Sequence, residues 1–132
     1  MTSEPLVQAA LDSRLNAVAP YSNFKVGAAL MTPEGKIYTG CNVENATYGL
    51  SVCAERVALW KALSEGERSF SRIAVASDRS RPASPCGACR QLLWEFAGDI
   101  EVILANPRGH TESHQLAALF PRAFDRGSLA EI

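Results

Sequence analysis

Apolar residues recur at intervals of three and four between Leu6 and Val18, the spacing that gathers them on one face of an α-helix. Pro20 follows, and proline ends helices because it lacks the backbone N–H that a further helical turn would use. This pattern predicts a first, amphipathic helix over residues 6–18, ending before Pro20.

Two apolar segments, residues 24–31 and 36–43, flank the sequence Thr-Pro-Glu-Gly at residues 32–35. Proline and glycine at these positions are typical of a tight turn, because proline presets one backbone angle and glycine tolerates conformations closed to other residues. The arrangement predicts a β-hairpin.

Beyond the hairpin, helix-like and strand-like patterns alternate. Helices are predicted over residues 53–64, from residue 85 or 86 to 96, and over 115–119, and strands over 72–77 and 100–104. His110 and His114 are expected in an exposed polar loop, and residues 123–132 give no clear pattern. The chain shows no internal repeat or interdomain linker, so we expect one α/β domain over residues 1–132, with helices on both faces of a mixed sheet.

The composition agrees with one globular domain, because 47% of the 132 residues are hydrophobic and can build a core without disulfides. The formal net charge is −1 and neither sign forms a long run, which argues against nucleic acid as a partner and favours a small substrate. No apolar stretch reaches the roughly 18 to 20 residues of a membrane span, and residues 1–5 lack signal-peptide features. We therefore expect a cytoplasmic protein with no membrane partner.

The chain has four cysteines, at positions 41, 53, 86 and 89. In a reducing compartment we expect them to be metal ligands, catalytic groups or core residues and not disulfides. Cys86 and Cys89 lie three residues apart at a predicted helix start, so both sulfurs fall on one face of the first turn. Cys53 begins another predicted helix, and the positive end of a helix favours thiolates, the form that binds metal. Three thiolates would hold one zinc ion and leave its fourth position for water.

Glu55 and Arg56 follow Cys53 so closely that they belong to the same candidate site. Glu55 is close enough in sequence to act as general base on a metal-activated water and to return the proton to a substrate nitrogen. Three thiolates around Zn²⁺ sum to a charge of −1, which weakens the acidifying effect of the ion on water. We hypothesise that Arg56 donates to the thiolates and offsets this charge.

These motifs resemble a known family. Cys-Ala-Glu at residues 53–55 and Pro-Cys-Gly-Ala-Cys at 85–89 resemble the zinc-dependent deaminase signature. The small, homotetrameric, three-cysteine cytidine deaminases resemble this sequence also at residues 20–30, 40–46, 48–50 and 86–91. A weaker similarity to them extends over residues 119–124. The resemblance implies a three-layer αβα sandwich with a roughly five-stranded sheet, one Zn²⁺ per subunit, and hydrolytic deamination of cytidine and deoxycytidine with release of ammonia, a reaction of pyrimidine salvage.

The resemblance also implies which residues meet the substrate. Asn42 and Glu44 would hold the ribose hydroxyls, and Phe24 would lie against the pyrimidine ring. Backbone groups near Ala54 and Ser84 would meet the edge of the base.

The resemblance further implies contacts between subunits. Tyr48 and Phe124 would reach the pocket of a neighbouring subunit in the homotetramer, although the C-terminal stretch departs most from the family pattern. Apart from the resemblance, Arg56 is hypothesised to support the metal ligands without binding the ion itself, and Gln91 is expected in the same supporting role.

Other interpretations stay open on the sequence alone. A Cys-x-x-Cys pair is also typical of a redox protein, and Cys41 could complete a four-thiolate structural zinc site in a non-catalytic binding module. The substrate could instead be a base, a nucleotide, a polynucleotide or an aminoglycosyl-cytosine antibiotic. The Glu44 carboxylate argues against a phosphate nearby, and the balanced charge argues against a polynucleotide.

Overall fold

Five strands form one mixed sheet within residues 4–130, the part of the chain that the computed structural model describes. The strand order is β2-β1-β3-β4-β5, with β3 and β4 parallel and the other neighbours antiparallel. The strands are β1 (Val26–Met31), β2 (Ile37–Cys41), β3 (Arg72–Ser77), β4 (Glu101–Ala105) and β5 (Thr111–Gln115). The predicted α/β class with a roughly five-stranded mixed sheet is confirmed.

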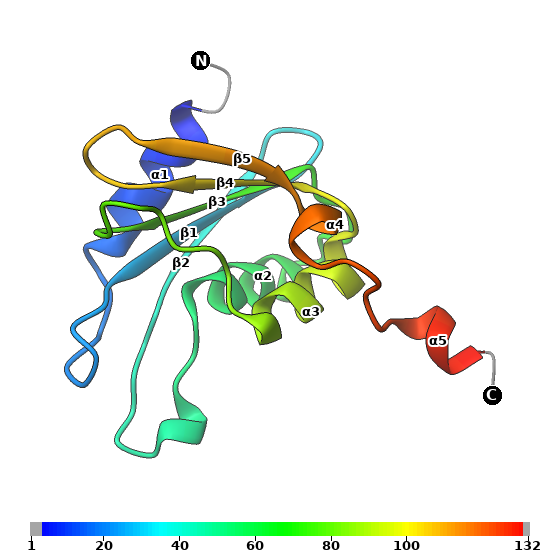
Figure 1. Cartoon of the computed structure of the whole chain (residues 1–132), viewed down its shortest axis with the longest axis horizontal. Coiled ribbons are helices and arrows are strands. Elements are labelled where there is room, and N and C mark those ends of the chain that lie inside the picture. Colours follow the sequence, from blue (N-terminus) through cyan, green and yellow to red (C-terminus); the bar gives the residue numbers. More distant parts are fainter. Residues whose placement is uncertain (1–3, 131–132) are drawn as a thin grey trace.

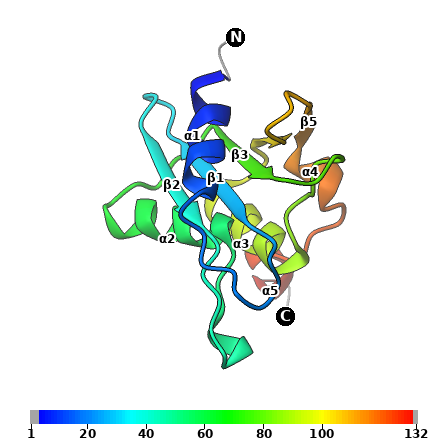
Figure 2. The ribbon, with the colours of Figure 1, turned by 90° about the vertical axis from the view of Figure 1, so that its left-hand side faces the viewer.

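Helices cover both faces of this sheet and give the three-layer αβα arrangement (Figures 1 and 2). Helix α1 (Glu4–Arg14) packs on one face, and α2 (Ala54–Ser64) and α3 (Gly87–Ala97) pack side by side on the other. The shorter elements are a 3₁₀ turn (Tyr48–Leu50), α4 (Leu116–Leu119) and α5 (Arg126–Ala130). No helix among the described residues is long and apolar enough to cross a bilayer.

Two glycines let the helices lie directly on the strands. A Cβ at Gly27 of β1 would come within 2.0 Å of the carbonyl oxygen of Ala10 in α1. A Cβ at Gly40 of β2 would lie 2.6 Å from the Ala58 nitrogen and 2.7 Å from the Ala54 oxygen in α2. Since these neighbours are backbone atoms, only glycine permits the observed spacing between sheet and helices.

The predicted hairpin and buried strands agree with the structure because their sequence signals are strong. β1 and β2 pair in antiparallel register, and the turn between them closes where Gly35 adopts φ +93° and donates to the Thr32 carbonyl at 2.9 Å. β3 spans the predicted residues 72–77, and its last five residues are buried. Helices α2 and α3 begin one residue after Cys53 and Cys86, close to their predicted starts.

The first helix is shorter than predicted, since it ends at Arg14 and not near residue 18. The reason is a competing pairing of the backbone: Val18 donates to the Asn42 carbonyl at 3.0 Å, and Glu44 donates to the Val18 carbonyl at 2.8 Å. The apolar side chains that extended the helical pattern, Leu15 and Val18, are 65% and 49% exposed.

Strand β5 was not predicted as an element, and His114 lies in it and not in a loop. Its sequence is Thr-Glu-Ser-His-Gln, so it carries no apolar alternation, and it pairs only with β4 at the edge of the sheet. His114 and His110 both face the Glu112 carboxylate, with Nε2–Oε distances of 3.1 and 3.4 Å. Residues 1–3, on which part of the signal-peptide expectation rests, and 131–132 lie outside the described residues.

Candidate active site

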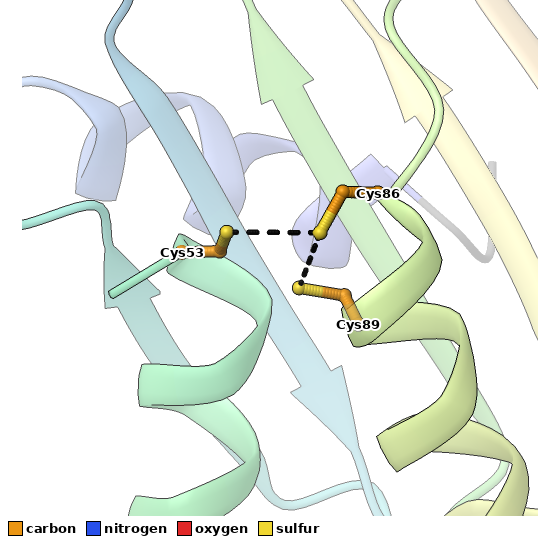
Figure 3. A group of neighbouring side chains, drawn as sticks. All are labelled: Cys53, Cys86 and Cys89. Carbon is orange, nitrogen blue, oxygen red and sulfur yellow. Dashed lines mark hydrogen bonds between the residues drawn. The ribbon is translucent and has the colours of Figure 1, made fainter. Parts of the chain in front are cut away.

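Three thiols converge between the N-termini of two neighbouring helices (Figure 3). Cys53 is the residue before α2, Cys86 is the residue before α3, and Cys89 lies in the first turn of α3. The Sγ atoms lie within 4.8 Å of one another, with Cys53–Cys86 at 3.9 Å and Cys86–Cys89 at 3.5 Å. Among residues 4–130, no other group of three or more His, Cys, Asp or Glu side chains converges in this way.

Local backbone structure leaves these thiols available. Cys53 and Cys86 both occupy the N-cap position in an extended conformation, and neither side chain makes a capping hydrogen bond. Serine or aspartate at an N-cap usually accepts a bond from the helix backbone, whereas these sulfurs remain free to point at each other. Two helix N-termini therefore direct their positive ends toward one set of sulfurs, which favours thiolates.

The arrangement fits a zinc ion. Zinc–sulfur bonds of about 2.3 Å in tetrahedral geometry separate the sulfurs by about 3.8 Å, and the two separations above bracket this value. Hydrogen bonding to Cys89, followed by donation from Arg56, lowers the pKa of Cys53 and favours its thiolate. Cys41 lies at the end of β2 and is not part of the group, so the four-thiolate structural site has no support in the geometry.

Glu55 lies beside the thiols in the first turn of α2 and is only 5% exposed. Burial removes water from its carboxylate and raises its pKa to about 7, and the Cys53 thiolate acts in the same direction. A carboxyl group whose pKa lies near neutral can both accept and release a proton, which is the property that a general acid–base catalyst requires.

A cavity of about 430 Å³ opens next to Glu55 and the thiols. Its walls come from β1 and the loop before it, from β3, from the segment between β2 and α2, from the first turn of α2, and from the loop before α3. The predicted site residues that line it are Phe24, Asn42, Glu44, Tyr48, Cys53, Ala54, Glu55, Arg56, Ser84 and Cys86. Thiols, a buried acid and polar side chains thus share one space large enough for a small organic substrate.

Comparison with known proteins identifies the family. The family described as "Cytidine and deoxycytidylate deaminase zinc-binding region" matches residues 1–105, which include the three thiols and Glu55. The chain belongs to this family. The resemblance noted in the sequence is thereby confirmed.

Individual relatives of this deaminase match over nearly their whole length. A cytidine deaminase of Sporosarcina psychrophila is 47% identical over 131 residues, which cover 98% of this chain and 96% of the relative. A probable cytidine deaminase of Dictyostelium discoideum is 50% identical over 127 residues, covering 96% and 86%. The crystal structure of cytidine deaminase from Burkholderia pseudomallei matches with a TM-score of 0.90 and 50% identity, covering 94% of this chain and all (100%) of that one.

In the deaminase, Asn42 and Glu44 are held in place by backbone groups at the cavity wall. Asn42 is 9% exposed; its Nδ2 donates to the Phe24 carbonyl at 2.7 Å, and its Oδ1 accepts from the Val26 N–H at 2.9 Å. Glu44 Oε1 accepts from the backbone N–H groups of Tyr21 and Ser22, both at 3.1 Å. The hydroxyl and N–H of Ser22 and the N–H of Tyr21 lower the pKa of Glu44, so this carboxylate stays charged.

Of the remaining predicted site residues, some line the cavity and others lie outside it. Phe24 lines the cavity, and Cζ of the Arg79 guanidinium lies over its ring, 5.0 Å from the ring centroid. Tyr48 lies at the cavity and is 75% exposed, with its ring edge against Tyr21. Gln91 and Phe124 do not line the cavity; Gln91 Nε2 donates to the Phe124 carbonyl at 2.7 Å, and the Phe124 side chain is 58% exposed.

Some lining residues of the deaminase were not identified in the sequence. Val75 and Ser77 of β3 form part of the cavity wall, and Ser22 binds Glu44. Val75 and Ser77 could have been found from the sequence, because side chains along a strand point alternately to its two faces. Residues 73, 75 and 77 therefore share the face of the sheet that packs against α2 and α3. Ser22 carried no such signal, since its contact is made by a loop.

Arg56 Nη2 of the deaminase donates to Cys53 Sγ at 3.6 Å, which is the contact that the hypothesised charge-offsetting role requires. Replacing Arg56 with glutamine is expected to weaken zinc binding about tenfold, since a positive charge and a donor to sulfur are both lost. Zinc retained after dialysis against a chelator and the pH–rate profile are the measurements, with Arg56→Lys as the charge-preserving control. Unchanged zinc retention and an unchanged profile in Arg56→Gln would contradict this role.

Proposed function

We propose that the protein catalyses the hydrolytic deamination of cytidine and deoxycytidine to uridine and deoxyuridine, with release of ammonia. One observation carries the proposal: two of the three convergent thiols, Cys53 and Cys86, line one cavity together with the buried Glu55 and with Asn42 and Glu44. The relatives named above are cytidine deaminases, in agreement with this substrate. The reaction belongs to pyrimidine salvage, and one domain over residues 1–132 carries it out.

Cys53, Cys86 and Cys89 would hold one zinc ion, which would supply the Lewis acidity for activating a water molecule. Glu55 takes a proton from the attacking water as oxygen adds to C4 of the base. The same carboxyl group gives this proton to the ring nitrogen. It then takes the second proton from the C4 hydroxyl and passes it to the amine, so that the C4–N bond breaks, the C4 carbonyl of the product forms and ammonia leaves. Burial of Glu55 supports this shuttle, because a pKa of about 7 makes both directions of proton transfer accessible.

Substrate orientation follows from the polar groups of the cavity. We propose that Asn42 and Glu44 hold the sugar hydroxyls, because each is already fixed by backbone bonds and retains hydrogen-bonding capacity. Phe24 would lie against the pyrimidine, and backbone groups near Ala54 and Ser84 would meet its edge. A carboxylate at position 44 favours a nucleoside over a nucleotide, since it would repel a phosphate.

We further propose a cytoplasmic homotetramer. Tyr48, Leu50 and Phe124 are 75%, 71% and 58% exposed, and neighbouring subunits would bury this apolar surface. Tyr48 and Phe124 would then reach the pocket of a neighbouring subunit. The four free cysteines suit a reducing compartment.

A substrate panel tests the proposed function. Purified, zinc-loaded protein is incubated with cytidine, deoxycytidine, cytidine monophosphate and cytosine, and loss of cytosine absorbance and release of ammonia are followed. Turnover is expected with both nucleosides, and kcat/KM for the monophosphate and the free base is expected to be lower by at least about 10²-fold, because one meets the Glu44 charge and the other lacks the sugar. Absence of nucleoside turnover, or a preference for the monophosphate, would overturn the proposal.

A further inference from the structure

Arg90 lies one residue after the thiol of Cys89 and folds back over the start of α3. Its Nε donates to the Pro85 carbonyl at 2.8 Å, its Nη2 to Ser84 Oγ at 2.8 Å, and its Nη1 to the Leu119 carbonyl at 3.0 Å. Arg90 is half-buried and forms no ion pair with any described residue. The guanidinium therefore serves as a three-way hydrogen-bond donor to neutral oxygens.

These bonds supply something that the start of α3 otherwise lacks. A helix start is usually fixed by an N-cap side chain that accepts a bond from the helix backbone. The N-cap residue here is Cys86, which makes no such bond and whose sulfur belongs to the thiol cluster. By holding the carbonyl of Pro85, Arg90 fixes the peptide that leads into Cys86, and the sulfur is left free.

The same guanidinium also holds a residue of the cavity wall. Ser84 lines this cavity, and its hydroxyl is held by Arg90. The bond to Leu119, at the end of α4, ties the arginine to a second part of the fold. Since three separate acceptors constrain one rigid, planar group, a displacement of Arg90 would move both the cavity wall and the start of α3.

We propose that Arg90 is a positioning residue that sets the Cys86 thiol for metal binding and the Ser84 wall for substrate binding. The second half of this proposal rests on the proposed function, whereas the first half concerns only metal retention. Geometry and not charge is the operative property, because the acceptors are two carbonyls and a hydroxyl. A lysine at position 90 would keep the charge but present one nitrogen where the guanidinium presents three.

Arg90→Lys and Arg90→Gln test the proposal, with Arg68→Lys as a matched control. Arg68 also donates to two backbone carbonyls, of Leu63 and Glu67 at 2.9 and 2.7 Å, but at the far end of α2. Transfer of zinc to a chromogenic chelator, measured without substrate, is expected to be about tenfold faster in both Arg90 variants and unchanged in Arg68→Lys. The KM for cytidine is expected to rise about fivefold, with a smaller change in kcat, as for a loss of ground-state binding.

Ser84→Ala separates the two halves of the role. Removal of this hydroxyl is expected to raise KM while leaving zinc transfer at the wild-type rate. The proposal is overturned if Arg90→Lys matches Arg68→Lys in both zinc transfer and KM, or if Arg90→Lys behaves as wild type while Arg90→Gln does not, which would make charge the cause. If Arg90→Lys fails to fold, Ser84→Ala decides: a raised KM supports the proposal and a wild-type KM overturns it. If the wild-type protein binds and releases zinc but does not deaminate cytidine, the proposed function is contradicted. The zinc-transfer measurements on the Arg90 variants still test the metal-binding half of the present proposal in that case.

Discussion

Replacing Glu55 with glutamine is expected to lower kcat for cytidine by at least about 10²- to 10⁴-fold while zinc stays bound. Glutamine keeps the size of the side chain, which is 5% exposed in the wall of the cavity, but it cannot take a proton from water. The loss should exceed that of a group that acts once, because Glu55 is proposed to move a proton in several steps. Steady-state kinetics and zinc content per chain, measured on the same preparation, are the readouts.

Glu44→Gln is the matched control, since both carboxylates line one cavity. The Glu44 carboxylate is bonded to the backbone N–H groups of Tyr21 and Ser22 and is proposed to hold the sugar. Its loss should therefore act mainly on KM, whereas the loss of Glu55 should act on kcat. A zinc-loaded Glu55→Gln protein with near wild-type turnover would disprove the proton shuttle.

Replacing Cys89 with alanine is expected to abolish measurable activity and reduce bound zinc to less than about a tenth of one ion per chain after dialysis. Cys89 is 1% exposed and its sulfur lies 3.5 Å from that of Cys86, so its removal leaves two thiolates that come from separate helices. Two ligands cannot hold the ion against a chelator as three do. Metal analysis and the deamination assay are the measurements.

Cys41→Ala is the control for this experiment. Cys41 is a free thiol at the end of β2 and does not belong to the convergent group. It should retain a full equivalent of zinc and wild-type turnover. Loss of zinc from Cys41→Ala would revive the four-thiolate structural site, and full zinc in Cys89→Ala would show that the metal binds elsewhere.

The parts of the fold that could be predicted from the sequence are those whose burial is one-sided or complete. β3 was predicted because a short apolar run bounded by polar residues is typical of a buried strand, and five of its residues are buried. The hairpin was predicted because Pro33 and Gly35 mark the turn. β5 could not be predicted, since an edge strand of polar residues gains its stability from the β4 backbone and not from its side chains. The predicted end of α1 was wrong for a related reason, because backbone hydrogen bonds at Val18 outweighed the helical pattern of the apolar side chains.

Some residues of the candidate site could likewise be predicted from the sequence, and others could not. Cys86 and Cys89 could be grouped because both lie within one helical turn, and Cys53 and Glu55 joined them through the helix-start argument and the family resemblance. The contact of Arg56 with sulfur was predicted from the charge of the three thiolates and from its position next to Glu55. Arg90 was not, because its partners are mostly backbone carbonyls, and no residue pattern records which carbonyls a long side chain will reach.

The missing side chain at Gly40 bears on the mutational tolerance of the enzyme. Backbone atoms of α2 lie so close to this strand position that even a methyl group would push the helix away, and Ala54, one of the residues it would strike, adjoins Cys53. A substitution at Gly40 would thus shift one corner of the thiol triangle while leaving every ligand in the sequence intact. Variant libraries built around this scaffold should hold position 40 constant as strictly as the cysteines, although it contributes no chemical group to the reaction.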